Sequence, residues 1–153
     1  MGRMATGVRG IRLREDDVCV GAVLARPGTV LLAVTENGYG KRTAIEEYMR
    51  GEDNAPQHRG GKGLKGYNVT EKTGKVADVE IVADTDDLLM ISDDGTIIRM
   101  AADSISTYGR ATQGVRLMRL AEGSRLISMA PTEREEESEL SAEETPAEET
   151  PQA

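Results

Sequence analysis

The residues with the clearest chemical meaning form a short basic turn, Gln57-His58-Arg59-Gly60-Gly61-Lys62-Gly63. Three glycines around Arg59 and Lys62 allow the backbone to turn tightly and to approach another surface closely. Two cations on such a turn, together with freed backbone N–H groups, suit the phosphates of a polyanion. The segment lacks the four-residue gap and the Lys-Ser/Thr ending of a P-loop, so it does not indicate a nucleotide-binding loop of that kind. The alternative interpretation is a glycine-rich loop with solvated charges.

Other cations accompany glycines elsewhere in the chain, and we expect them to share the same polyanionic partner. Residues 1–130 carry equal numbers of basic and acidic residues, so this expectation requires the acidic side chains to lie on another face. Those acidic residues are Asp84, Asp86, Asp87, Asp93 and Asp94. The predicted binding residues are Gln57, His58, Arg59, Gly60, Gly61, Lys62, Gly63, Lys65, Lys41, Arg42, Arg9, Arg12, Arg110, Arg116 and Arg119.

Composition excludes several other kinds of site. The chain has 153 residues with one His and one Cys, which excludes a four-Cys zinc site and an intramolecular disulfide framework and argues against a His/Cys catalytic pair or a His-rich metal site. No apolar run reaches the length of about 18 residues that a membrane-spanning helix needs, and the first ten residues do not resemble a secretory signal. We therefore expect no catalytic residue, no metal, no cofactor and no membrane contact, in a reducing cytoplasm. The single Cys19 stands between two valines, which predicts a buried small side chain.

The elements that must position the cations recur along the chain. Three segments align with one another, at residues 6–13, 62–69 and 113–120, and their glycines Gly7, Gly63 and Gly114 lie 56 and 51 residues apart. A second repeated unit, residues 32–38, matches residues 89–95 at an offset of 57. Repeats of this period are typical of solenoids, propellers or other arrays of similar units.

Each repeated unit has the pattern of a β structure. Asn37-Gly38 and Asp94-Gly95 are strong hairpin signals, and we expect type I′ turns there. Short apolar runs with β-branched residues predict strands before and after these turns. The predicted strands are 18–24, 30–34, 76–82, 88–91 and 126–129, together with the Gly-Val-Arg-type segments. About four short strands per unit are what a blade requires, so the fold class is all-β, and the only helical candidate is residues 44–50.

The end of the chain has a different character. Residues 131–153 contain nine Glu and one Arg, which accounts for the whole net charge of −8. With Leu140 almost alone among its apolar residues, this segment cannot bury enough surface to offset its ordering entropy. We expect residues 1–130 to form the β domain and residues 131–153 to form a disordered acidic tail. This tail either solubilises the chain or competes with a polyanion for the basic surface.

Three of these motifs resemble one family in the expected order. The segment Gln57–Gly63 closely resembles the basic box of DNA gyrase A, Gln-Arg-Arg-Gly-Gly-Lys-Gly, with His58 in place of an Arg. The segments Gly38–Thr43 and Gly109–Leu117 are similar to recurring segments of the C-terminal domain in that family. The family's principal box lies in its first blade, and the box here is similar to the second, later one that some members carry.

The resemblance implies a β-pinwheel, a propeller-like ring of usually six blades, of which residues 1–130 would supply the last two or three. It also implies binding and wrapping of duplex DNA without sequence preference, as a non-catalytic module of a type IIA topoisomerase that introduces negative supercoils. The implied partners are duplex DNA, the rest of gyrase A, and gyrase B, in the cytoplasm of a bacterium at its nucleoid. ATP and Mg²⁺ would then belong to other domains of the holoenzyme.

Two alternatives stay open from the sequence. The C-terminal domain of topoisomerase IV has similar blades and tends to lack a good box, so Gln57–Gly63 favours gyrase. A propeller-like protein-interaction module without a DNA role would show salt-insensitive affinity and an exposed apolar edge. A hydrolase built on such a fold needs convergent acid, base or nucleophilic groups, and the sequence offers none.

Overall fold

The structure is a computed structural model that describes residues 2–50, 53 and 55–134. Every pair of neighbouring strands in its sheets is antiparallel, and its only helical segments are two short 3₁₀ turns. The all-β prediction is therefore confirmed for the described residues. No helical segment in this part of the chain has the length and apolarity needed to cross a bilayer. The elements are β1 (Val30–Thr35), β2 (Tyr39–Ala44), η1 (Ile45–Tyr48), β3 (Met49–Arg50), β4 (Ala55–Pro56), β5 (Val76–Val82), β6 (Asp86–Ser92), β7 (Ile97–Ala101), η2 (Ala102–Ser104), β8 (Val115–Arg116) and β9 (Leu126–Glu133).

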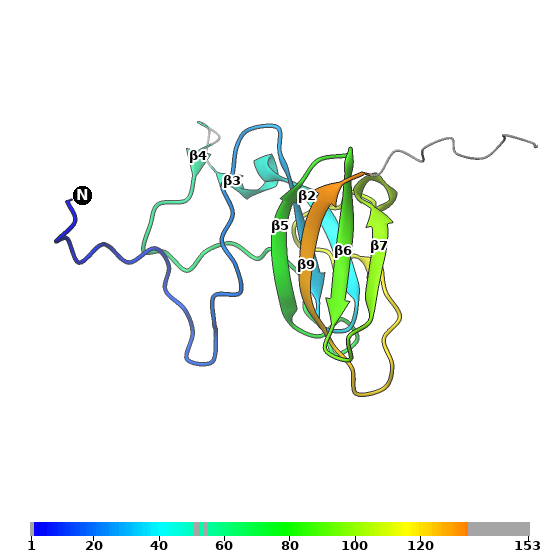
Figure 1. Cartoon of the computed structure of the whole chain (residues 1–153). Helices are drawn as coiled ribbons and strands as arrows, with labels where there is room; N and C mark the ends of the chain where they lie inside the picture. The colour runs from blue at the N-terminus through cyan, green and yellow to red at the C-terminus, as the bar shows by residue number, and fades with distance from the viewer. Residues whose placement is uncertain (1, 51–52, 54, 135–153) are drawn as a thin grey trace, which may run out of the picture.

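Two sheets correspond to the two copies of the repeat. The first has the strand order β5-β1-β2-β8, and the second has the order β7-β6-β9. In each sheet a hairpin receives a third strand from farther along the chain, β5 on β1 and β9 on β6. The strands β3 and β4 form a separate short pair. Figure 1 shows β9, β6 and β7 in front of β1 and β2, with the N-terminal residues extending away from both sheets.

The hydrophobic core lies between the two sheets. Period-2 alternation directs Leu32 and Val34 of β1 and Leu88 and Met90 of β6 into it, and all four are fully buried. Leu126 of β9 closes the same cluster. Each sheet alone would leave this apolar face in water, so the stacking of neighbouring units supplies the burial that a single repeat lacks.

Both predicted hairpins are present, but their turns differ from the expected type I′. In both hairpins five residues lie between the last ladder pairs, Val34↔Gly40 and Ile91↔Ile97. A backbone hydrogen bond runs from Gly38 N to Thr35 O at 3.0 Å and from Gly95 N to Ser92 O at 3.1 Å. Gly38 and Gly95 occupy the left-handed region, with φ of 83° and 85°. This is the geometry of a turn followed by a left-handed glycine, which explains why Gly stands at this place in both loops.

Residues 18–24 do not form the predicted strand. They pass beside β5, where an added Cβ at Gly21 would lie 2.9 Å from Val79 Cγ2, but no backbone ladder joins them to a strand of the described chain. Most of their apolar side chains are exposed, with Val18 at 75% and Leu24 at 68%, while Val23 is half-buried. Cys19, predicted to be buried, is also exposed, and its thiol donates to Gly21 O at 3.4 Å. The helical candidate at residues 44–50 contains only the single 3₁₀ turn η1.

The C-terminal strand is longer than expected. β9 continues to Glu133 and pairs Leu88 with Pro131 and Asp87 with Thr132, three residues past the predicted boundary at residue 130. Proline is tolerated here because β9 is an edge strand of its sheet. The rest of the predicted acidic tail, residues 135–153, lies outside the described residues.

Candidate functional site

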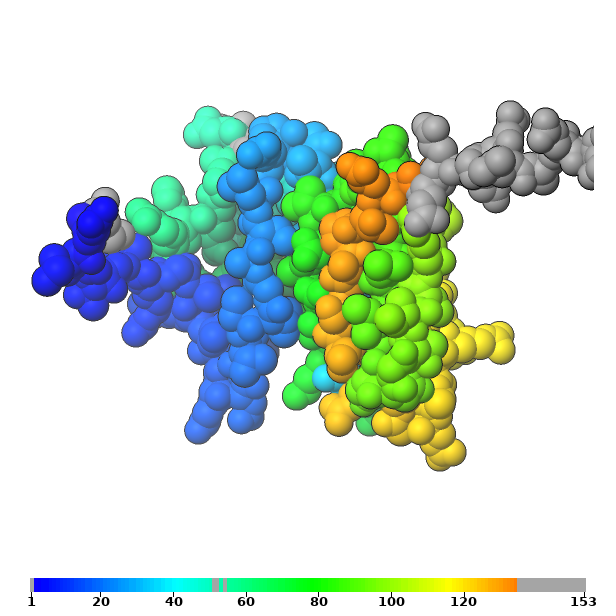
Figure 2. Space-filling model, in the orientation of Figure 1, coloured from blue at the N-terminus to red at the C-terminus, as the bar shows by residue number. Residues whose placement is uncertain are grey.

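The first repeated segment, residues 6–13, lies against the basic turn that leads into the second, residues 62–69. Gly60 N donates to Gly10 O at 2.8 Å, and Arg12 N donates to Gly61 O at 2.7 Å. A parallel bridge joins Ile11 to Gly61 between these two bonds. Figure 2 shows the N-terminal residues beside those near position 60, at the end of the molecule away from β7.

This contact gathers four predicted binding residues. Arg9 and Arg12 flank the bridge on one segment, and Arg59 and Lys62 flank it on the basic turn. All four side chains belong to exposed residues, as does His58. Four cations on two hydrogen-bonded segments, rather than on one solvated loop, are suited to several phosphates of one polyanion.

The second and third segments are also in direct contact. Asn68 N donates to Thr112 O at 3.0 Å, and Arg110 Nη1 donates to Lys65 O at 3.0 Å. Lys65 is exposed and its ammonium donates to Asn68 Oδ1 at 3.1 Å. Arg110 is half-buried, and its Nε has no hydrogen-bond partner among the described residues. The three segments are thus joined in succession, with the second between the other two.

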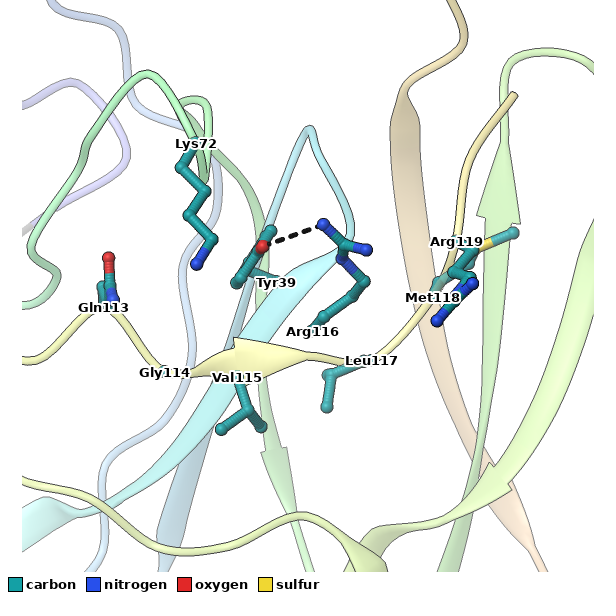
Figure 3. Close-up of a pocket in the computed structure, with 9 residues that line it drawn as sticks. All are labelled: Tyr39, Lys72, Gln113, Gly114, Val115, Arg116, Leu117, Met118 and Arg119. Atoms are coloured by element: carbon teal, nitrogen blue, oxygen red, sulfur yellow. Dashed lines mark hydrogen bonds between the residues drawn. The ribbon is translucent and has the colours of Figure 1, made fainter. Parts of the chain in front are cut away.

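The third segment then crosses β2 and continues the row of cations. β8 pairs with β2 through Tyr39↔Arg116 and Gly40↔Val115 only. Beyond it, Arg116 and Arg119 line a shallow groove with Lys72 (Figure 3). The Arg116 guanidinium donates to Tyr39 Oη at 3.1 Å and lies 5.5 Å from the centre of that ring, and Lys72 Nζ lies 5.6 Å from the same centre. Both cations remain exposed.

Two predicted binding residues do not reach the surface. Lys41 is 0% exposed and Arg42 is 9% exposed, because both faces of β2 are covered. Lys41 donates to carbonyls of residues 109–112, while Arg42 Nε donates to Ile105 O at 2.5 Å and its Nη1 pairs with Asp84. Their prediction as polyanion contacts is therefore wrong: these cations satisfy protein carbonyls and a carboxylate.

Two of the acidic residues that were expected on another face, Asp87 and Asp93, have partners away from the three segments. Asp87 on β6 pairs with Arg99 at 2.8 Å and with Arg134 at 3.0 Å, and these bonds lower the pKa of its carboxyl. Asp93 accepts from Ser124 and from the backbone of Arg125, which lowers the pKa of Asp93 as well. These carboxylates belong to β6 and the turn that follows it, not to the three segments.

Charge segregation along the chain is a signal that the sequence carried and that pattern analysis missed. Residues 1–14, 55–70 and 104–121 contain ten Lys and Arg and not a single Asp or Glu. These windows contain the three segments that the fold joins. They add Arg3 and Arg14, both exposed, to the predicted set. Lys72, which no sequence pattern singled out, joins the set only through the groove beside Tyr39.

We name the exposed or half-exposed cations gathered by these contacts the cation track. It consists of Arg9, Arg12, Arg59, Lys62, Lys65, Lys72, Arg110, Arg116 and Arg119. Gln57 and the three glycines of the basic turn are not cations; they belong to the turn that carries Arg59 and Lys62. His58 is the residue next to Arg59 in the same turn. Such an arrangement can bind an extended polyanion by charge, and nothing in it singles out a reacting atom.

Comparison with known proteins gives one family over most of the chain. The family described as DNA gyrase C-terminal domain, beta-propeller, matches residues 1–26, 29–50, 55–83 and 86–133. DNA gyrase A of Staphylococcus aureus is 42% identical over 146 residues, which cover 94% of this chain and 16% of that protein. The same protein from another strain is 46% identical over 124 residues, covering 80% and 13%. The chain therefore spans only a small part of these curated relatives.

Solved structures agree with this match. A structure of the DNA gyrase A C-terminal domain superposes with a TM-score of 0.70 and 30% identity, covering 82% of this chain and 41% of that one. The C-terminal domain of DNA topoisomerase IV superposes with the same TM-score at 18% identity, covering 82% and 38%, and that likeness concerns the fold alone.

Proposed function

The chain belongs to the DNA gyrase C-terminal domain family of type IIA topoisomerases, with its β-pinwheel fold, and from this we propose that it binds and curves duplex DNA without sequence preference. Negative supercoiling by a complete gyrase, with ATP and Mg²⁺ bound on other domains, is the activity that such a module would support. The rest of gyrase A, gyrase B and duplex DNA are the partners we propose.

One observation carries this proposal. The three carboxylate-free windows of the sequence are the segments that the fold joins by backbone hydrogen bonds, so the cations follow one another without an intervening Asp or Glu from these segments. Duplex DNA presents a dense row of phosphates, and a protein that neutralises them gains affinity by releasing counterions. This explains how a β domain with no net charge can still bind a polyanion.

The proposed curvature rests on the extent of the track. Its members come from several segments, from the N-terminal residues to the groove beside β2, and we propose that the duplex bends to contact all of them. Smooth bending of a short duplex by 40–90° costs about 1–6 kcal/mol, which a few additional phosphate contacts offset.

Removal of two cations from the basic turn tests the proposal directly. We expect Arg59→Ala with Lys62→Ala to lower DNA curvature in a ring-closure assay and to reduce the salt slope of binding by about 2. Both side chains are exposed, so the free energy of unfolding is expected to change by less than about 0.5 kcal/mol.

The matched control is Lys75→Ala with Arg125→Ala. These two exposed cations line a different groove, together with Asp16, Asp17 and Glu36, so their loss changes the net charge equally but not the track. Equal curvature in the wild-type chain and the Arg59/Lys62 variant, or an equal loss in the control, would refute a role for the basic turn.

We also propose that the acidic C-terminal residues compete with DNA for the track. Residues 135–153 carry eight glutamates, whereas residues 131–133 belong to β9 and Arg134 pairs with Asp87, so the truncation has to follow Arg134. A chain that ends at Arg134 is expected to bind duplex DNA about three- to tenfold more tightly at low salt, and this gain is expected to vanish at about 0.5 M salt because of screening. If this truncation does not change the affinity for DNA at low salt, the acidic residues do not compete with DNA for the track.

A further inference from the structure

We propose that Lys41 and Tyr67 form a clasp that positions the third cation-bearing segment beside the second, so that Lys41 supports DNA curvature as a positioning residue and not as a phosphate contact. The part of this inference that concerns DNA rests on the proposed function. The part that concerns the protein stands on the geometry of the clasp alone.

The first half of the clasp is a buried ammonium in a cage of oxygens. Lys41 Nζ donates to Gly109 O at 3.0 Å, Arg110 O at 2.6 Å and Thr112 O at 2.8 Å, and lies 3.3 Å from Thr112 Oγ1. An ammonium has three N–H donors, and all of them are directed to one loop some seventy residues away in the sequence. A buried charge without such partners would be strongly unfavourable, so the loop and the lysine depend on each other.

The second half of the clasp comes from the second segment. Tyr67 is 6% exposed, and its hydroxyl donates to Gln113 O at 2.5 Å. Its ring centre lies 4.8 Å from Lys41 Nζ, which places the cation over the aromatic face. Together the two side chains bind the carbonyls of residues 109, 110, 112 and 113, so almost every carbonyl of this loop is fixed.

The clasp holds the start of the third segment, whereas the end of that segment is held separately: Leu117 N and Met118 N donate to Gly38 O at 2.8 and 3.1 Å, and Met118 belongs to the hydrophobic core. The ladder between β2 and β8 is only two residues long. Arg110 lies inside the clasped loop, and its guanidinium reaches Lys65 O. Arg116 follows directly after the loop on β8. Loosening the loop would therefore separate Arg110 from the cations of the second segment, while Met118 stays in the core and Arg116 keeps its hydrogen bond to Tyr39.

The repeat itself supports a positioning role. At the offset of 57, Arg42 corresponds to Arg99, but Lys41 corresponds to Ile98 on β7. In the described part of the chain β7 is an edge strand with no segment across it, whereas β2 carries β8. A lysine is thus present on the strand that a cation-bearing segment crosses and is replaced by an apolar residue on the strand that none crosses.

Protonation of Lys41 gives the clasp a measurable signature. Burial, and to a lesser extent the neighbouring Arg110, lowers the pKa of Lys41 to about 8. The other titratable groups around the clasp are tyrosines: burial raises the pKa of Tyr67 to about 12 and raises that of Tyr48, and Tyr39 lies near Tyr67. Above pH 8 the neutral amine keeps only two N–H donors for three carbonyls, so we expect the loop to loosen.

Stability is expected to move in the opposite direction. The pKa of Lys41 in the folded chain lies below the ordinary value of 10.5, so between about pH 8 and 10.5 the unfolded chain binds more protons than the folded chain. The free energy of unfolding, measured relative to a Lys41→Met variant, is therefore expected to rise with pH across this window. The rise in stability follows from the lowered pKa alone, so the readout specific to the clasp is the faster amide exchange of residues 109–113 over the same pH range.

The test uses the complete 153-residue chain and its Lys41→Met and Lys75→Met variants. Without DNA, we expect amide hydrogen exchange of residues 109–113 to be about tenfold faster in Lys41→Met at pH 7, with no change in the exposed control Lys75→Met. With DNA, we measure ring closure of a duplex of about 150 bp, near the persistence length. Relative to the wild type at pH 7, the fall in ring closure for Lys41→Met is expected to be at least as large as the fall for the wild type at pH 9. Lys41→Met itself is expected to show no fall between pH 7 and 9, whereas Lys75→Met, which keeps the titrating Lys41, is expected to fall as the wild type does.

Tyr67→Phe provides a milder second variant that removes one hydroxyl. It is expected to speed exchange of the same amides by a smaller factor, so the inference remains testable if Lys41→Met fails to fold. Unchanged exchange of residues 109–113 in both variants would overturn the clasp. Faster amide exchange together with unchanged DNA curvature would overturn the positioning role. Failure of the wild-type chain to bind DNA would overturn the proposed function. In that case the exchange result alone would decide whether the clasp exists.

Discussion

Affinity of this chain for duplex DNA is expected to fall about a thousandfold when monovalent salt rises from about 50 to 200 mM. Neutralisation of Z phosphates makes the logarithm of the binding constant fall with a slope near −0.9Z against the logarithm of salt concentration. If about six of the nine members of the cation track contact phosphates at once, the slope is about −5. Fluorescence anisotropy titrations of one duplex at four salt concentrations measure it.

The comparison that sharpens this prediction uses two duplexes of unrelated sequence. Because the track meets sugar and phosphate, both are expected to give the same slope and affinities within about threefold. A slope near zero would contradict DNA binding through the track and favour the protein-interaction module instead. The exposed apolar side chains of the N-terminal segment, such as Met4, Val8 and Val18, would then be the contact surface to examine.

The second large effect is expected from Gly114→Ala. Gly114 has a φ of +69°, which costs a residue with a Cβ about 1–2 kcal/mol. An added Cβ would also collide with Gly40 O and lie 2.8 Å from Tyr67 Oη, and neither β2 nor the clasped tyrosine can yield easily. We expect the free energy of unfolding to fall by about 3 kcal/mol and the third segment to move away from β2, which removes Arg116 from the track.

Gly109→Ala is the matched control for this substitution. Gly109 lies five residues earlier in the same segment, its backbone is not left-handed, and an added Cβ would meet no atom within 4 Å. Chemical denaturation and ring closure are therefore expected to be close to wild type for Gly109→Ala and strongly altered for Gly114→Ala. Similar behaviour of the two variants would contradict the close approach of the third segment to β2.

The structural elements that depend on residues close together in the chain could be predicted from the sequence. Asn37-Gly38 and Asp94-Gly95 mark both hairpins because a left-handed residue is required at one fixed place in each loop, although the number of loop residues was not specified by the pair itself. The offset of 57 between the two hairpins predicted two equivalent sheets. The strand expected at residues 18–24 could not be predicted in this way, because an apolar run forms a strand only where its backbone hydrogen-bonds to a neighbouring strand, and these residues pass beside β5 without a ladder.

The residues of the candidate site also divide into those whose exposure was predicted from the sequence and those whose burial was not. The basic turn at Gln57–Gly63 and the neighbouring Lys65 were predicted as exposed cations, and the structure leaves them exposed. Lys41 and Arg42 have the same residue types and glycine neighbours, yet they are buried. Sequence alternation indicates that successive side chains point to opposite faces of a strand, but it does not indicate that both faces of β2 are covered.

The sequence by itself determined the two hairpins, the repeat and the windows in which cations occur without carboxylates, because each depends on residues close together in the chain or on simple periodicity. Only the tertiary structure decided which cations face outward. The carbonyls that bind Lys41 lie at residues 109–112, and the partners of Arg42 lie at Ile105 and Asp84. A buried cation is stable only where such distant groups replace water, so its role depends on packing that no local pattern encodes.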